Sequence, residues 1–181
     1  MNKTLFISEQ FLKDISTVNL NVDSKVIMNS ILYAQEMNIL PVCGSNLYNE
    51  LITQVTNNSL TEANSNLIEN YIKLCLVQFT LFELVDYLVY RFEPKGVLKL
   101  KSDNAEVISR AEILDLKEKF RDKGEWYATR LSKYLCANSS LYPAYSVQSA
   151  QDALYPKKEN FSIGLYLPTL DYSNKKSEGR D

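Results

Sequence analysis

The chain of 181 residues is 45% hydrophobic and 23% charged, which fits one domain with a packed core plus an appendage. Its formal net charge is −2, and no run of Lys and Arg forms a basic stripe, so the sequence argues against a nucleic-acid-binding groove. It contains no histidine, which excludes Ser-His-Asp and Cys-His catalytic arrangements and zinc sites that use histidine.

Helices are predicted from the start of the chain, which has no apolar block long enough for a signal peptide. Ser8 is placed to cap a helix over residues 9–16, and Asp23 to cap a helix over residues 24–39. We expect the latter helix to end before Pro41, because proline lacks the N–H that a helix interior needs and disfavours helix in the residue before it.

A third helix is predicted to follow the turn at Gly44, with Ser45 or Asn46 as its cap. Apolar residues at i, i+4 spacing between residues 47 and 55 support it. A polar loop comes next, in which Thr61 offers a cap for another helix start.

A long central helix is predicted over residues 66–92. It is apolar nearly all round, so other elements should surround it. Glu83 and Asp86 interrupt its apolar stretch, and two carboxylates near the centre of a bilayer would be costly, so we expect a buried helix rather than a membrane span. Pro94 and Gly96 are expected to end it.

Two more elements precede the tail of the chain. Apolar and lysine residues alternate over residues 97–101, which predicts a short edge strand or a hairpin arm. An amphipathic helix is predicted over residues 109–137, where Gly124 marks a close helix contact or a kink.

The composition changes at Ser139, after which no helix of useful length is predicted. We therefore divide the chain into a helical domain, residues 1–138, and an extended C-terminal arm, residues 139–181. Within the arm, "NFSIGLYLPTL" places Phe161 and every second residue after it on one face, as a strand does.

The expected fold class is thus mainly α: a helical bundle around one long central helix, with a short β-hairpin or strand-like segment and an extended C-terminal arm. Tyrosines are enriched at protein interfaces, so those of the arm suggest an adhesive surface; the competing interpretation is that the arm folds back on its own domain. The candidate interface residues are Val97, Leu98, Lys99, Leu100, Lys101, Tyr142, Tyr145, Tyr155, Phe161, Ile163, Leu165, Tyr166 and Leu167.

Chemistry-bearing groups are sparse, and we expect no catalytic residue, no cofactor and no metal. Glu83 and Asp86 share one helix face, as an acid/base pair or a metal site would need, but the favoured interpretation is that they face polar partners such as Lys73 or arginines of another helix. The cysteines are three in number, with no CxxC spacing, which indicates free, buried and reduced thiols.

Five segments follow one another in a recognisable order: "LYAQEMNILPVCGSNLYNELI", "LIENYIKLCLVQFTLFELVDYL", "EPKGVLKLKSDN", "LKEKFRDKGEWYATRLSKYL" and "NFSIGLYL". In these segments the chain resembles a family from Bacteroidetes phages and prophages. In crAss-like phages, proteins of this kind are similar to head-to-tail connector (adaptor) proteins, which form a ring beneath the portal. The motifs are structural and not catalytic.

The resemblance implies a structural virion protein of the head-tail neck, made in the host cytoplasm and assembled as a dodecameric ring. Its implied partners are further copies of the chain, the portal protein and neighbouring neck or tail rings. DNA would pass through as cargo without sequence-specific binding, and no membrane is involved. The alternatives are a helical binding module of a prophage that is not part of the virion and, less favoured, a carboxylate-based enzyme at Glu83 and Asp86.

Overall fold

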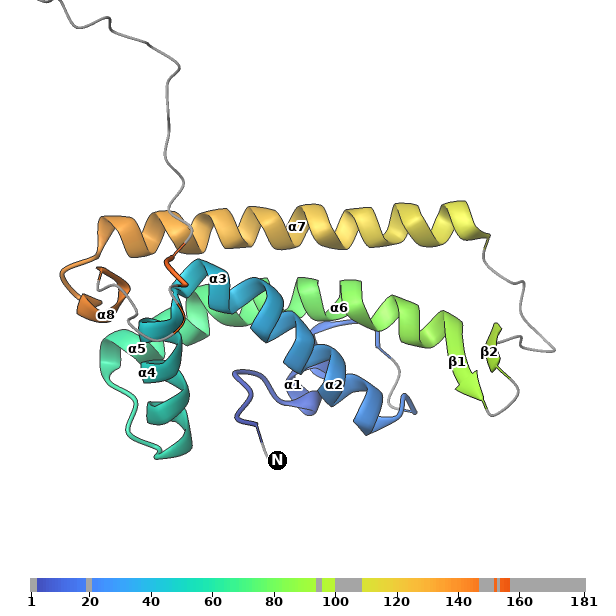
Figure 1. Ribbon diagram of the computed structural model, residues 1–181, viewed down its shortest axis with the longest axis horizontal. Coiled ribbons are helices and arrows are strands. Elements are labelled where there is room, and N and C mark those ends of the chain that lie inside the picture. The colour runs from blue at the N-terminus through green and yellow to red at the C-terminus, as the bar shows by residue number, and fades with distance from the viewer. Residues whose placement is uncertain are drawn as a thin grey trace, which may run out of the picture.

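Helices make up most of the computed structural model, and two long ones lie side by side along its length (Figure 1). The structure describes residues 3–18, 21–93, 96–99, 109–146, 152 and 154–156; for residues 90–93 and 96–99 it describes the backbone only. The expectation of a mainly α bundle around one long central helix is confirmed.

The N-terminal part contains α1 (Glu9–Ile15) and a continuous helix built from α2 (Ser24–Ala34), η1 (Gln35–Ile39) and α3 (Leu40–Cys43). α4 (Ser45–Thr56) follows, and the central helix is then built from α5 (Glu62–Leu67), η2 (Ile68–Ile72) and α6 (Lys73–Val89). The strands β1 (Tyr90–Glu93) and β2 (Gly96–Lys99) lead to α7 (Arg110–Ala137) and the short α8 (Pro143–Ser146).

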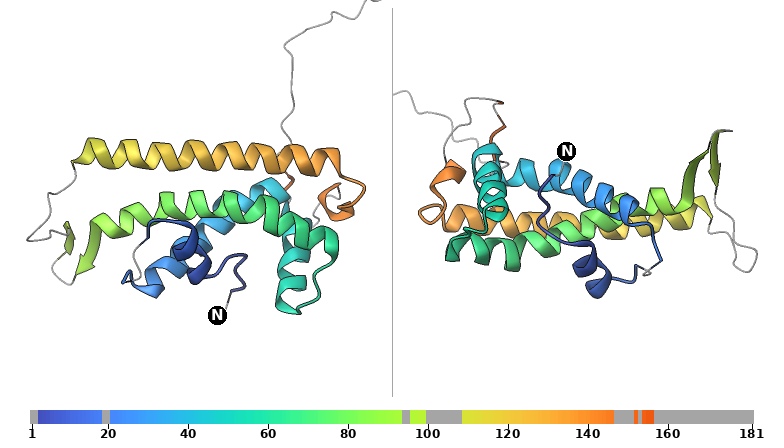
Figure 2. Two further views of the ribbon diagram at one scale, coloured as in Figure 1. Left: turned by 180° about the vertical axis from the view of Figure 1, so that it is seen from behind. Right: turned by 90° about the horizontal axis from the view of Figure 1, so that it is seen from below.

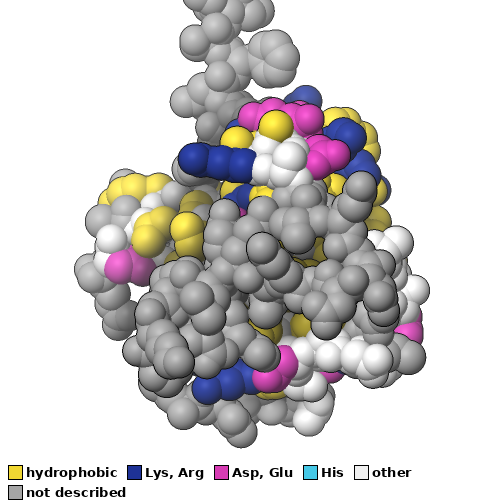
Figure 3. Space-filling view, turned by 90° about the vertical axis from the view of Figure 1, so that its right-hand side faces the viewer, with side chains coloured by type: hydrophobic (Ala, Val, Ile, Leu, Met, Phe, Trp, Pro, Cys, Tyr) yellow, Lys and Arg dark blue, Asp and Glu magenta, His cyan; other side chains and the backbone are white. Residues whose placement is uncertain are grey.

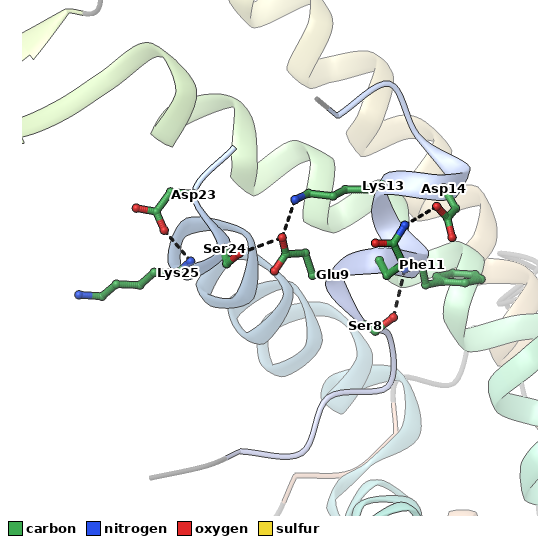
Figure 4. A network of polar contacts seen from close by, with 9 residues as sticks. Ser8, Glu9, Phe11, Lys13, Asp14, Asp23, Ser24 and Lys25 are labelled. Carbon is green, nitrogen blue, oxygen red and sulfur yellow. Dashed lines mark hydrogen bonds and ion pairs between the residues drawn. The ribbon is translucent and has the colours of Figure 1, made fainter. Parts of the chain in front are cut away.

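The predicted caps at the first two helices are confirmed. Ser8 accepts a hydrogen bond from the Phe11 N–H at 3.1 Å, and Asp23 accepts one from the Lys25 N–H at 2.8 Å (Figure 4). Glu9 joins the two helices, because it receives hydrogen bonds from Lys13 on its own helix and from Ser24 on α2. The hydrogen bond from Ser24 to Glu9 therefore links the start of α1 to the start of α2.

The helix that begins at Ser24 does not end before Pro41, contrary to the prediction. It continues to Cys43, and the cap at its end is Gly44, whose φ of +73° a residue with a side chain rarely adopts. Just before the proline lies the wide turn η1, in which the Leu40 N–H donates to the Gln35 carbonyl five residues back. Such a π turn takes up the strain that a proline causes inside a helix. Gly44 also stands at the N-cap of α4, where Ser45 or Asn46 was expected.

Gln35, inside this π turn, is completely buried and fastens the N-terminal segment to the bundle. Its Oε1 accepts from the Phe6 N–H at 2.8 Å, while its Nε2 donates to the Thr4 carbonyl at 3.1 Å and to the Tyr48 hydroxyl at 2.9 Å. The Gln35 amide thus supplies hydrogen-bond partners for backbone groups of Thr4 and Phe6, which lie before α1 and outside any helix.

The central helix runs from Glu62 to Val89, with Thr61 as its cap, and forms the middle of the core. α7 packs along one side of α6 and α2 packs along another, so α6 lies between them (Figures 1 and 2). This arrangement buries the nearly continuous apolar surface of α6, as the sequence predicts.

α6 and α7 are in close contact at Gly124, which decides the prediction of a close contact or a kink in favour of the contact. A Cβ at this position would lie 2.8 Å from the ring of Phe79 on α6. The Gly124 carbonyl also accepts a weak hydrogen bond from the Cys75 thiol at 3.6 Å.

Replacement of Gly124 by alanine is therefore expected to destabilise the protein by about 1–3 kcal/mol, because the buried Phe79 ring must move. This exceeds the gain of about 1 kcal/mol in helix propensity. The second change Phe79→Leu should make the cost of Gly124→Ala smaller, and chemical denaturation of the four proteins of this cycle measures it. Equal costs of Gly124→Ala in the presence and absence of Phe79 would contradict the close contact.

The last turn of the predicted central helix is instead a strand. Residues 90–93 form β1, which pairs antiparallel with β2 in the register Tyr90↔Lys99 to Glu93↔Gly96. Two aromatic residues and the following Pro94 favour extended backbone here, because proline disfavours helix in the residue before it. The strand-like segment is confirmed as one arm of a hairpin for residues 97–99, while Leu100 and Lys101 lie outside the described residues.

Candidate functional site

The hairpin is the first of the predicted interface segments, and it stands at one end of the elongated molecule (Figure 2). β2 holds Val97, Leu98 and Lys99. Among the described residues the sheet has only these two strands, so each strand has one edge with backbone groups that no third strand pairs. Such an edge is a template for the addition of another strand.

Tyr142 and Tyr145 do not lie at an interface, which corrects their assignment. Each side chain is only 1% exposed and belongs to the core. The Tyr142 hydroxyl donates to the Ala63 carbonyl at 2.9 Å, and its ring lies edge-on to Tyr134, which stacks on Tyr71. Burial raises the pKa of both Tyr142 and Tyr145.

The start of the predicted arm is therefore part of the body, as the competing interpretation had it. Tyrosine rings bury a large apolar area, and the hydroxyl of Tyr142 finds a carbonyl partner when it is buried. Composition alone suggested an extended arm from Ser139 onward. In the structure residues 139–146 do contain only one short helix, α8, but Tyr142 and Tyr145 pack into the core.

The described residues 152 and 154–156 lie at the opposite end of the molecule from the hairpin, next to the start of α4 (Figure 1). The Ser45 hydroxyl donates to Asp152 at 2.5 Å, and the Ser45 N–H donates to the Leu154 carbonyl at 3.3 Å. The ring of Pro156 lies against Gly44, where a Cβ would be 2.7 Å away. Tyr155 is 49% exposed, as an interface residue must be in the free subunit.

The remaining candidate interface residues belong to the C-terminal segment, residues 157–181, which lies outside the described residues. They are Phe161, Ile163, Leu165, Tyr166 and Leu167. Their assignment stays a prediction.

A groove of about 480 Å³ opens between the continuous η1–α3 helix, α6 and α7, and no sequence pattern predicted it. We call it the α3–α6–α7 groove; its lining residues are Met37, Asn38, Pro41, Val42, Phe79, Phe82, Arg121, Glu125, Ala128, Thr129 and Ser132. They come from three separate stretches of the chain, so only the packing of the helices brings them together. Most of its surface is apolar, as in sites that accept apolar side chains.

Glu83 and Asp86 lie on α6 near its hairpin end. Asp86 has a basic partner, but it is a lysine of α7 and not Lys73 or an arginine, because Lys73 pairs with Glu69. Lys117 of α7 contacts Asp86 at 2.5 Å and places its ammonium group over the Phe82 ring at 4.3 Å. Burial raises the pKa of Glu83; Lys117 opposes this effect and Asp86 adds to it. Among the described residues, no three His, Cys, Asp or Glu side chains gather as metal ligands would.

The thiols are a mixed group. Cys43 and Cys75 are buried as predicted, and burial raises the pKa of Cys43 to about 12, so this thiol stays protonated and unreactive at neutral pH. Cys136, in contrast, is exposed, which corrects its expected burial.

The outer surface of α7 carries charges of both signs. Figure 3 looks at the hairpin end and shows Lys or Arg side chains beside Asp or Glu side chains around the start of this helix. Arg121 illustrates the mixture, because it lies within 4 Å of three carboxylates, those of Glu118, Asp122 and Glu125. No helix in the described part of the chain is both long and apolar enough to cross a bilayer.

Comparison with known proteins gives one match. No curated protein and no solved structure matches the chain. A family model described as "Family of unknown function (DUF6712)" matches residues 39–153, which is more than half of the chain and begins at the last residue of η1. The chain belongs to this DUF6712 family.

Proposed function

We propose that the protein is a structural virion protein, a subunit of a head-to-tail connector ring that docks on the portal and lets DNA pass. The observation that carries the proposal is the separation of two different features along the molecule. The hairpin stands at one end of the long axis, and Pro156, the last described residue, lies beside Gly44 toward the other end (Figure 1). A ring is built from heterologous contacts, which need two different patches on every subunit.

The chemistry of the described residues agrees with a structural role. Asp86 is held by Lys117, and the thiols of Cys43 and Cys75 are buried. The mixed charges of α7 suit a surface that meets other proteins rather than a phosphate backbone. The resemblance to phage connector proteins supplies the proposed location, the neck of the virion, and the proposed partners: eleven further copies, the portal and the adjacent neck or tail rings.

The proposal is tested by the mass of the protein in solution and by its presence in particles. We expect the full chain to form rings, alone or upon addition of the portal protein, and to be found in purified virions. A chain that ends at Glu159 should keep its helical circular dichroism but lose ring formation, because the C-terminal segment joins neighbours. A strictly monomeric full chain that is absent from particles would favour the alternative of a non-virion binding module.

A further inference from the structure

The α3–α6–α7 groove presents an apolar surface that the described residues leave open. Met37, on its rim, is 63% exposed, the largest exposed fraction among the large hydrophobic residues of the described part. Pro41 of α3 and Phe82 of α6 are partly exposed beside it. An apolar strip of this kind, bordered by the polar side chains of Asn38 and Arg121, is typical of a docking site.

The length of the groove fits a short extended segment. On α7 its lining residues run from Arg121 to Ser132, which at about 1.5 Å per residue corresponds to roughly 16 Å. Residues 161–167 would span about 20 Å in extended form. One strand-like segment of this chain is therefore long enough to lie along the whole groove.

The side-chain pattern of that segment also fits. Phe161, Ile163, Leu165 and Leu167 alternate with smaller or polar neighbours, so an extended backbone would direct all four toward one side. That side matches the apolar floor that Phe79, Phe82 and Ala128 provide.

Pro156, the last described residue before this segment, lies close to the α3–α6–α7 groove. Pro156 packs on Gly44, which follows the groove residue Val42 by two positions. Residues 157–160 connect Pro156 to Phe161 and allow a reach of roughly 17 Å. Pro156, the last described residue, thus lies beside the α3 end of the groove of its own subunit, and a short connection would suffice for the segment to reach a groove.

We propose that Phe161–Leu167 of one subunit occupies the α3–α6–α7 groove of the neighbouring subunit. The choice of the neighbour rests on the proposed ring: a segment docked on its own body would satisfy both patches within one chain and leave neither to join copies. The groove and the segment are then the two complementary patches of one heterologous contact.

Disulfide trapping in the full-length protein tests this contact. Two populations are prepared with the exposed Cys136 replaced by serine; one carries Arg121→Cys in the groove wall and the other carries Leu165→Cys in the segment. After mixing and mild oxidation, we expect a covalent species of twice the subunit mass. In the matched control, Met28→Cys replaces Arg121→Cys, because Met28 is 51% exposed on α2 and lies outside the groove.

Three outcomes would overturn the proposal: no covalent species, equal trapping in the Met28→Cys control, or a chain with both Arg121→Cys and Leu165→Cys that closes only within itself. A second readout uses Met37→Glu, which should weaken self-association at least tenfold, while Met28→Glu leaves it unchanged and both keep the helical spectrum. Rings that form normally with Met37→Glu would overturn the docking site but leave the connector function standing. Disulfide trapping between chains that are never found in purified particles would support the docking site but contradict the connector function.

Discussion

Replacement of Gln35 by glutamate is expected to destabilise the protein by about 3–5 kcal/mol at pH 7.5, the largest loss that we predict for a single substitution. The side chain is fully buried, and its Nε2 donates to the Thr4 carbonyl and the Tyr48 hydroxyl. A carboxylate of the same shape still accepts from the Phe6 N–H, but its second oxygen would face the Thr4 carbonyl with no proton between them.

The loss should depend on pH in a defined direction. Burial and the facing carbonyl raise the pKa of the introduced carboxyl above its ordinary value of about 4.3 in the unfolded chain. The folded variant then binds its proton more tightly than the unfolded one, so its stability falls as the pH rises above about 4.3. Urea unfolding at pH 5 and pH 8 measures this, and we expect the smaller loss at pH 5.

Gln10→Glu is the matched control for the change from amide to carboxylate. Gln10 is exposed in the first turn of α1, where a negative charge is favourable, but its Nε2 donates to Asp14 at 2.6 Å and a carboxylate would repel Asp14 instead. Because this pair is exposed, the change should still cost no more than about 1 kcal/mol. If Gln35→Glu were as mild as Gln10→Glu, the amide would not hold the N-terminal segment in the way that the structure shows.

Truncation after Asn138 is expected to abolish cooperative unfolding, whereas truncation after Pro156 should leave it nearly intact. The first truncation removes Tyr142 and Tyr145, both buried, and the loss of a buried aromatic side chain costs about 3–5 kcal/mol. Two such losses approach the whole stability of an ordinary domain, which is about 5–15 kcal/mol. The second truncation keeps both tyrosines and the contact of Pro156 with Gly44.

Thermal unfolding followed by circular dichroism compares the two truncated chains with the full chain. Tyr142→Phe in the full chain serves as a control, because it keeps the ring and removes only the hydroxyl, with its hydrogen bonds to the Ala63 carbonyl and the Tyr134 hydroxyl; it should cost about 1–2 kcal/mol. A chain that ends at Asn138 and melts like the full chain would restore the original boundary of the arm. Unfolding of the chain that ends at Pro156 would place residues 157–181 in the core of their own subunit.

Predictions from the sequence were good where the signal is local. The two long helices, which the structure has over residues 62–89 and 110–137, were predicted from their apolar patterns over residues 66–92 and 109–137. The caps Ser8, Asp23 and Thr61 were predicted from their side-chain chemistry. These features depend on residues within one or two helical turns, because capping and amphipathic periodicity act over that range. The close contact at Gly124 was predicted for a related reason, since glycine inside a helix is costly without a compensating role.

The fold class and the order of the helices could therefore be predicted from the amino-acid sequence alone. Four features became visible only in the folded chain. The helix continues through Pro41, and the buried Gln35 amide binds the N-terminal segment; Tyr142 and Tyr145 belong to the core, and three distant stretches line one groove. Each of these depends on contacts between residues far apart in the chain. A periodic pattern tells which face of a helix is apolar, but not which other element covers that face or leaves it open.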